Sequence, residues 1–124
     1  MKSLLIYSQF LDFGQLYHEI FISHEWNVLV SHTTSQLEIY LSIKNIDCIL
    51  VDGRLGCENL DKLIQILNKK STIKKYPLCI VDYDNLRGNS QLVNNYMGKS
   101  IYLDSLNLSP YEMDGLLRTF LGGQ

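Results

Sequence analysis

Short apolar runs alternate along the whole chain with segments in which apolar residues recur at helical spacing. The runs lie at residues 4–7, 28–30, 48–52, 78–81 and 101–103. A short, uninterrupted apolar run is typical of a strand that is buried on both faces of a sheet. Strands that alternate with helices along a chain form parallel sheets with helices on both faces. The sequence therefore predicts a five-stranded, doubly wound α/β fold.

Two segments carry clear helix start signals. Ser109 is a predicted N-cap, with Pro110 at the first helical position and Glu112 at the third. Ser35 and Glu38 predict a similar capping box for an earlier helix. Together with the apolar stripes, these signals predict helices near residues 13–21, 35–41, 60–67, 92–97 and 109–121.

Size and composition limit the function classes. The chain has 124 residues, of which 46% are hydrophobic, so we expect a single domain over residues 1–124 with one core. A net charge of -2 gives no electrostatic reason to expect direct binding to nucleic acid or to an anionic membrane. We find no apolar run of transmembrane length, no signal peptide and no CxxC spacing among the three cysteines. We therefore expect a reduced, cytoplasmic protein in which Cys48 and Cys79 are buried in strands.

Asp52 ends the third apolar run, and Asp47 directly precedes it. The carboxyl ends of parallel strands border the crevice in which open α/β folds bind ligands and carry out chemistry. This spacing of the two acids resembles the third strand of bacterial response-regulator receiver domains, and the resemblance extends over the whole chain. It implies a flavodoxin-like sheet of strand order 2-1-3-4-5, in which Asp52 matches the residue that accepts a phosphoryl group. Tyr102 matches the aromatic switch residue of the fifth strand, with simple core packing as the alternative explanation.

Four positions depart from the pattern of that family. Ser8 and Gln9 stand where receivers carry two adjacent acids that hold a magnesium ion. Asp82 replaces the hydroxyl residue that ends strand four, and Ser105 replaces the lysine that pairs with the phosphoryl group. Phosphoryl transfer to a carboxylate relies on a divalent cation and on fixed positive charge. These changes therefore indicate that phosphorylation of Asp52 is disfavoured.

The resemblance places strands three and four side by side, so that Asp52 and Asp82 face each other. Two unit charges about 5 Å apart repel by roughly 3 kcal/mol at an effective dielectric near 20. Arg54 offsets part of this repulsion. Replacement of either acid by asparagine is then expected to raise the free energy of unfolding by up to about 1 kcal/mol.

Two interpretations of Asp52 stay open at this stage. In the first, it is a leftover acid at the end of a strand. In the second, Asp52 and Asp82 form a cation site with Asp12, Ser8 and Gln9 nearby. Gln9 and Asp52 are then the candidate metal ligands. We expect no cofactor, apart from Mg²⁺ if the acceptor site is active.

Two function classes follow from the resemblance. The first is an atypical receiver, or pseudo-receiver: a signalling domain that binds a protein, with little or no phosphorylation at Asp52 and no enzyme activity. The alternative is a phosphoaccepting receiver of a two-component phosphorelay, for instance as the N-terminal input domain of a transcriptional regulator. A small-molecule binder of flavodoxin-like shape is disfavoured, because the loop at residues 8–14 is neither glycine-rich nor hydroxyl-rich.

Four of the eight tyrosines lie after residue 82: Tyr83, Tyr96, Tyr102 and Tyr111. Receivers contact partners there, through their fourth helix, fifth strand and fifth helix, and tyrosine is enriched at protein interfaces. The expected partner is a histidine kinase, an output domain or a downstream regulator. A homodimer through the same elements is a further expectation.

Overall fold

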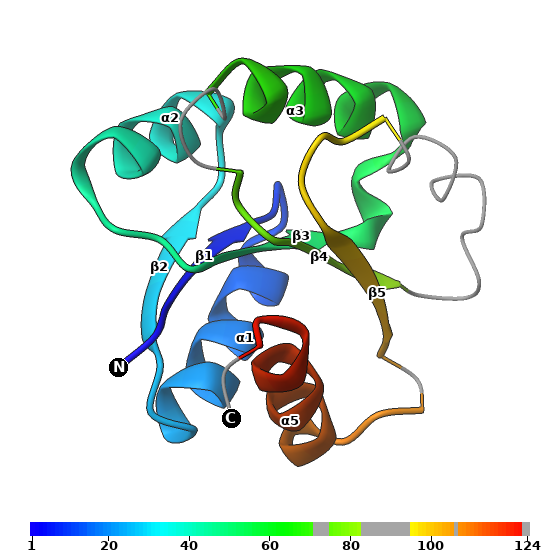
Figure 1. The fold of residues 1–124 in the computed structure, drawn as a ribbon. Helices are drawn as coiled ribbons and strands as arrows, with labels where there is room; N and C mark the ends of the chain where they lie inside the picture. The colour runs from blue at the N-terminus through cyan, green and yellow to red at the C-terminus, as the bar shows by residue number, and fades with distance from the viewer. Residues whose placement is uncertain (71–74, 83–94, 106, 123–124) are drawn as a thin grey trace.

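Five parallel strands form the central sheet of the computed structural model, in the order β2-β1-β3-β4-β5 (Figure 1). The strands are β1 (Ser3–Tyr7), β2 (Asn27–Ser31), β3 (Cys48–Asp52), β4 (Leu78–Asp82) and β5 (Ser100–Asp104). The structure describes residues 1–70, 75–82, 95–105 and 107–122, with the backbone alone for Cys57, Lys70 and Asp82. Strand positions, parallel pairing and strand order confirm the predictions from the sequence.

Helices cover both faces of this sheet (Figure 1). On one face lie α2 (Thr34–Ile43) and α3 (Cys57–Lys70), and on the other α1 (Leu11–Ser23) and α5 (Pro110–Phe120). A short 3-10 helix, η1 (Gly53–Leu55), follows β3 directly. Most of the predicted fourth helix falls in residues 83–94, outside the described residues. Tyr96 and Met97, at its expected end, precede β5 without helical structure.

The helix caps agree with the sequence in one case and differ in the other. Ser109 and Glu112 form the predicted capping box of α5. The N-cap of α2 is Thr33 and not Ser35: the Thr33 hydroxyl accepts a hydrogen bond from the backbone N–H of Gln36 over 3.1 Å. The Gln36 side chain in turn accepts from the backbone N–H of His32 over 2.8 Å. Thr33 and Ser35 both carry a hydroxyl, and the helix begins after the earlier of the two.

Apolar side chains fill the space on both sides of the sheet. All five residues of β3 are buried, as expected for the central strand of a sheet covered by helices. Alternate residues point to opposite faces, so that Ile49 joins the core under α2 and α3, and Leu50 the core under α1 and α5. Cys48 and Cys79 are buried in the second core, as predicted. None of the described helices is both long enough and apolar enough to cross a membrane.

Candidate functional site

Asp52 is the last residue of β3 and lies at the carboxyl edge of the sheet, as predicted. β3 runs between β1 and β4, and Val51 lies opposite Tyr7, so that Ser8 leaves β1 beside Asp52. The Asp52 side chain is 1% exposed, and among the described residues it is the one charged side chain that is buried. A buried carboxylate is costly unless its oxygens are paired and hydrogen-bonded. The partners of Asp52 therefore define what this site can do.

Arg54 supplies most of those partners. Its backbone N–H donates to Asp52 Oδ1 over 2.9 Å. In the guanidinium, Nε lies 3.1 Å from Oδ1 and 3.2 Å from Oδ2, and Nη2 lies 2.9 Å from Oδ2. The Ser8 hydroxyl donates to Oδ2 over 2.8 Å. Each carboxylate oxygen thus has at least two donors, and the negative charge faces a positive one.

The Arg54 side chain is itself held by the first turn of α1. Its guanidinium carbon lies 4.5 Å from the centroid of the Phe10 ring and 5.9 Å from that of Phe13. Nη2 also lies 3.6 Å from Asp12 Oδ1, but Asp12 is 78% exposed, so this pair contributes little to stability. Cation–π contact with the two rings therefore helps to keep the guanidinium over Asp52.

Ser8 forms hydrogen bonds with neighbouring residues through its N–H, its carbonyl and its hydroxyl. Its N–H donates to the carbonyl of Ser31 over 3.1 Å, and its carbonyl accepts from Nδ1 of His32 over 2.9 Å. Its hydroxyl accepts from the backbone N–H of Phe10 over 2.9 Å. Ser8 therefore orients Asp52 with a neutral hydroxyl, which binds hard divalent cations far more weakly than a carboxylate does.

Gln9 does not join this group of side chains. It is exposed after β1, and its side chain forms a hydrogen bond with the Tyr7 hydroxyl. Burial raises the pKa of Tyr7 above its usual value, and the hydrogen bond with Gln9 lowers it by a smaller amount. Of the three residues expected near Asp52, the structure brings Ser8 into contact and Asp12 onto the far side of Arg54, whereas Gln9 pairs elsewhere.

The remaining predicted positions lie on β4 and β5. The backbone of Asp82 ends β4, beside β3 and at the same edge as Asp52. The Asp82 side chain lies outside the described residues, so the facing pair of carboxylates stays a prediction. Tyr102 is half-buried on β5 and packs against the core under α2 and α3, and Ser105 follows β5 in a turn. Their roles as switch aromatic and altered lysine position also stay predictions.

The side chains that the structure describes at this edge do not fit a divalent cation. The described part of the chain contains no group of three or more His, Cys, Asp or Glu residues that could hold a metal ion. Hard cations such as Mg²⁺ need several oxygen ligands, whereas both oxygens of Asp52 accept hydrogen bonds from Arg54. Gln9 and Asp52 as metal ligands stay a prediction, and this arrangement argues against it.

From the sequence, Arg54 was expected only to offset part of the repulsion between Asp52 and Asp82. The available signal was local: an acid at the end of a strand, followed by glycine and arginine. Asp52 is the N-cap of η1 and accepts from the N–H of Arg54, which starts a tight turn. This turn places the Arg54 side chain next to the Asp52 carboxylate.

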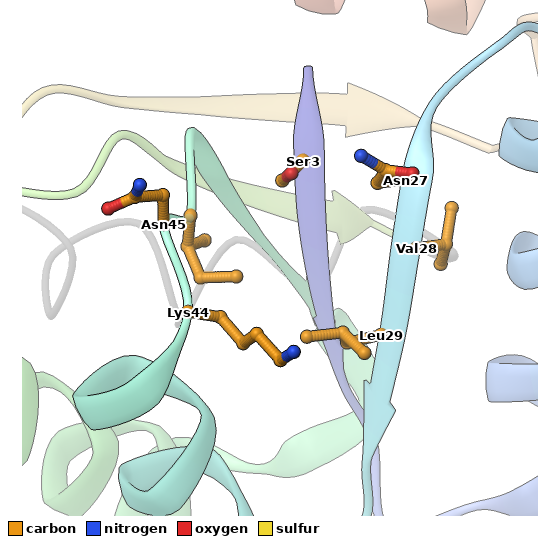
Figure 2. A pocket seen from close by; sticks show the side chains of 7 residues that line it. Ser3, Asn27, Val28, Leu29, Lys44 and Asn45 are labelled. Atoms are coloured by element: carbon orange, nitrogen blue, oxygen red, sulfur yellow. The ribbon is translucent and has the colours of Figure 1, made fainter. Parts of the chain in front are cut away.

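A hollow of about 440 Å³ lies at the opposite, amino edge of the sheet (Figure 2). It is lined by Ser3, Asn27, Val28, Leu29, Lys44, Asn45 and Ile46. Figure 2 shows the Lys44 side chain directed toward Leu29 of β2. The hollow is separated from Asp52 by the length of the strands, so it takes no part in the chemistry at the carboxyl edge.

Comparison with solved structures identifies the fold. A response regulator receiver domain from Bermanella marisrubri superposes with a TM-score of 0.79 at 12% identity, covering 96% of this chain and 97% of that one. The receiver domain of the sensor histidine kinase PA1611 from Pseudomonas aeruginosa PAO1, which has a magnesium ion in its active-site cleft, gives 0.78 at 15% identity and covers 98% of both chains. A two-component response regulator from Clostridium difficile gives 0.78 at 15% identity, covering 98% and 97%.

The sequence itself matches no family model and no curated protein. Identities between 12% and 15% carry information on the fold alone. The structural likeness nevertheless extends over nearly the whole chain. The sheet also has the strand order that the sequence resemblance implied. The chain therefore has the fold of a response-regulator receiver domain.

Proposed function

We propose that this chain is a pseudo-receiver: a signalling domain that binds a partner protein and does not accept a phosphoryl group at Asp52. One observation carries the proposal. The carboxylate that matches the phosphoacceptor is buried, and both of its oxygens are bound by the side chain of Arg54.

Phosphorylation of Asp52 has two physical requirements that this arrangement opposes. The attacking oxygen must be reached by the phosphoryl donor, whereas the Asp52 side chain is 1% exposed and covered by Arg54. Charge on the transferred group must also be offset, for which a divalent cation and a fixed cation are the usual means. Ser8, Gln9 and Ser105 provide no charge for this purpose.

Incubation with acetyl phosphate and Mg²⁺, followed by intact-mass measurement, tests the proposal. The unmodified chain is expected to gain no phosphate mass. A gain that is abolished by Asp52→Asn would contradict the proposal and establish the alternative, a phosphoaccepting receiver. A variant with the family residues at all four altered positions is expected to recover some acceptor activity. Its substitutions are Ser8→Asp, Gln9→Asp, Asp82→Thr and Ser105→Lys.

The partner surface that we propose is formed by β5 and α5. β5 is an edge strand of the sheet, and α5 carries Tyr111, which is 77% exposed, and Leu116. Of the other tyrosines predicted at the interface, Tyr83 lies outside the described residues, Tyr96 is buried in the core and Tyr102 is half-buried. Of the three that the structure describes, Tyr111 is therefore the best placed for contact with a partner. A second copy of the chain is the proposed form of partner, since symmetric dimers are the commonest oligomers.

Light scattering over a concentration series tests the dimer. Tyr111→Glu is expected to weaken self-association and to leave the fold intact, because the side chain is exposed. Ile43→Glu is the matched control: Ile43 is an exposed apolar residue of α2, on the other face of the sheet. Equal weakening by both variants, or a monomer at every concentration, would remove β5 and α5 as a dimer surface.

A further inference from the structure

We propose that the Arg54 guanidinium is the permanent counter-cation of Asp52 and that it excludes divalent metal ions from this edge of the sheet. The inference rests on the proposed function and gives it a physical cause. Under this proposal the site is inactive for two reasons. Arg54 occupies Asp52, and the charged residues of the family are replaced by Ser8, Gln9 and Ser105.

The geometry gives the guanidinium the position that a metal ion would need. Nε and Nη2 together contact both oxygens of Asp52, at 2.9 to 3.2 Å. The same Nη2 lies 3.6 Å from Asp12 Oδ1, so the guanidinium stands between the two carboxylates. A divalent ion that used either oxygen of Asp52 would have to displace Arg54.

Displacement of Arg54 is opposed by three further features. The guanidinium remains protonated at every accessible pH, so it does not leave by losing its charge. Its cation–π contact with the Phe10 ring also holds it in place. Its backbone N–H also binds Asp52, so side chain and main chain approach the carboxylate from one short turn. Little conformational entropy remains to be lost when the pair forms.

Removal of the guanidinium leaves two carboxylates near one vacated volume. Asp52 and Asp12 both contact Arg54 in the native structure. Without the arginine, their oxygens and the hydroxyl of Ser8 become available to a hard cation. The structure therefore gives opposite expectations for the unmodified chain and for a variant that lacks the guanidinium.

Mn²⁺ binding, followed by the loss of the electron paramagnetic resonance signal of free Mn²⁺, tests the proposal. Arg54→Ala is expected to bind one Mn²⁺ per chain at least about tenfold more tightly than the unmodified chain. The double variant Arg54→Ala with Asp52→Asn is expected to lose this gain. Circular dichroism establishes that each variant is folded, and Arg54→Gln, which keeps more of the stem, carries the same expectation if the alanine variant does not fold.

Arg118→Ala is the matched control. The Arg118 and Arg54 side chains are almost equally exposed, at 34% and 35%. Like Arg54, Arg118 pairs with a carboxylate, that of Asp114 over 3.0 Å, and lies over an aromatic ring, 5.0 Å from the centroid of Trp26. Arg118 therefore has the same kind of environment at a distance from Asp52, and its removal is expected to leave Mn²⁺ binding unchanged.

Three results would overturn the proposal: equal Mn²⁺ affinity in the unmodified chain and Arg54→Ala, a gain that survives Asp52→Asn, or the same gain in Arg118→Ala. None of these results changes the outcome of the acetyl phosphate test on the unmodified chain, so the proposed function would not be rejected with the metal exclusion. Conversely, phosphorylation of the unmodified chain would reject the pseudo-receiver without any measurement on Arg54. The two proposals therefore fail separately.

Discussion

Arg54 binds Asp52 through both its main chain and its side chain. The backbone N–H reaches Oδ1 over 2.9 Å, and Nη2 reaches Oδ2 over 2.9 Å. The turn of η1 brings the two residues together, so this half of the site forms locally. Ser8, which arrives from β1, adds the contact that depends on the assembled sheet. The site is thus a closed ion pair inside a receiver fold.

Asp52→Asn is expected to lower the free energy of unfolding by about 1–3 kcal/mol, because a buried carboxylate loses charge-assisted hydrogen bonds and the Arg54 cation loses its partner. This reverses the expectation from the sequence, in which relief of repulsion with Asp82 raised stability. Urea denaturation at neutral pH measures the difference. A rise in stability would show that repulsion outweighs the pair with Arg54.

The fold was predictable because its determinants are short-range patterns. β3 is apolar at every position before Asp52, and buried parallel strands require that pattern. The capping box at Ser109 fixed the start of α5 for the same reason: the signal and the structure lie within one turn. α2 shows the limit of such reasoning, since Thr33 and Ser35 both carry a hydroxyl and only the backbone conformation at Thr33 makes it the N-cap.

The site was predictable as a position and not as a set of contacts. The alternating pattern predicts parallel strands, which bring Ser8 and Asp52 to one edge of the sheet. The strand order that places β1 beside β3 was implied by the family resemblance. The direction of the Arg54 side chain depends on the turn of η1 and on the aromatic surface of Phe10, and neither is encoded in a periodic pattern. Arg54 lies outside the positions that were matched to the receiver pattern, so its contact with Asp52 could be found only from the structure.

Glu112 gives a prediction on pH. The Ser109 N–H donates to its carboxylate over 3.0 Å, and the hydrogen bonds with Ser109 hold the pKa of Glu112 below the ordinary 4.5. A lowered pKa in the folded state adds stability above the unfolded pKa, which is lost as the pH falls through the folded pKa.

Glu112→Gln is therefore expected to be less stable than the unmodified chain at neutral pH, and the difference is expected to vanish at pH values well below 4.5. Urea denaturation at both ends of this range measures it. A difference that is constant with pH would assign the effect to packing or to helix propensity, and not to the charge at the start of α5.

Cys48 and Cys79 are expected to resist thiol reagents while the chain is folded. Burial, with a smaller contribution from the charge of Asp47, raises the pKa of Cys48 to about 12, and burial raises that of Cys79 well above its usual value. The thiolate is the reactive form, so both thiols are protected by protonation as well as by lack of access. Peptide mapping after labelling with DTNB, with and without urea, measures this. Modification of either residue without urea would contradict the burial of the core under α1 and α5.

Gly14 lies where α1 packs closely against β2 and the residue after it. Of the two glycines in the described α-helices, it is the one at which an added Cβ would clash. A Cβ there would lie 2.8 Å from Val30 Cγ1 and 3.0 Å from His32 Cε1, whereas a Cβ at Gly115 of α5 would meet no atom within 4 Å. Val30 is β-branched and yields little by rotation. His32 cannot move without disturbing its 2.9 Å hydrogen bond to the carbonyl of Ser8.

Gly14→Ala is therefore expected to lower the free energy of unfolding by about 1–3 kcal/mol through overpacking. Gly115→Ala is the matched control and is expected to raise it by about 1 kcal/mol, because alanine has the higher helix propensity and no neighbour opposes it. Urea denaturation of the two variants measures both effects. Equal stabilisation by the two substitutions would mean that α1 moves away from β2 at little cost.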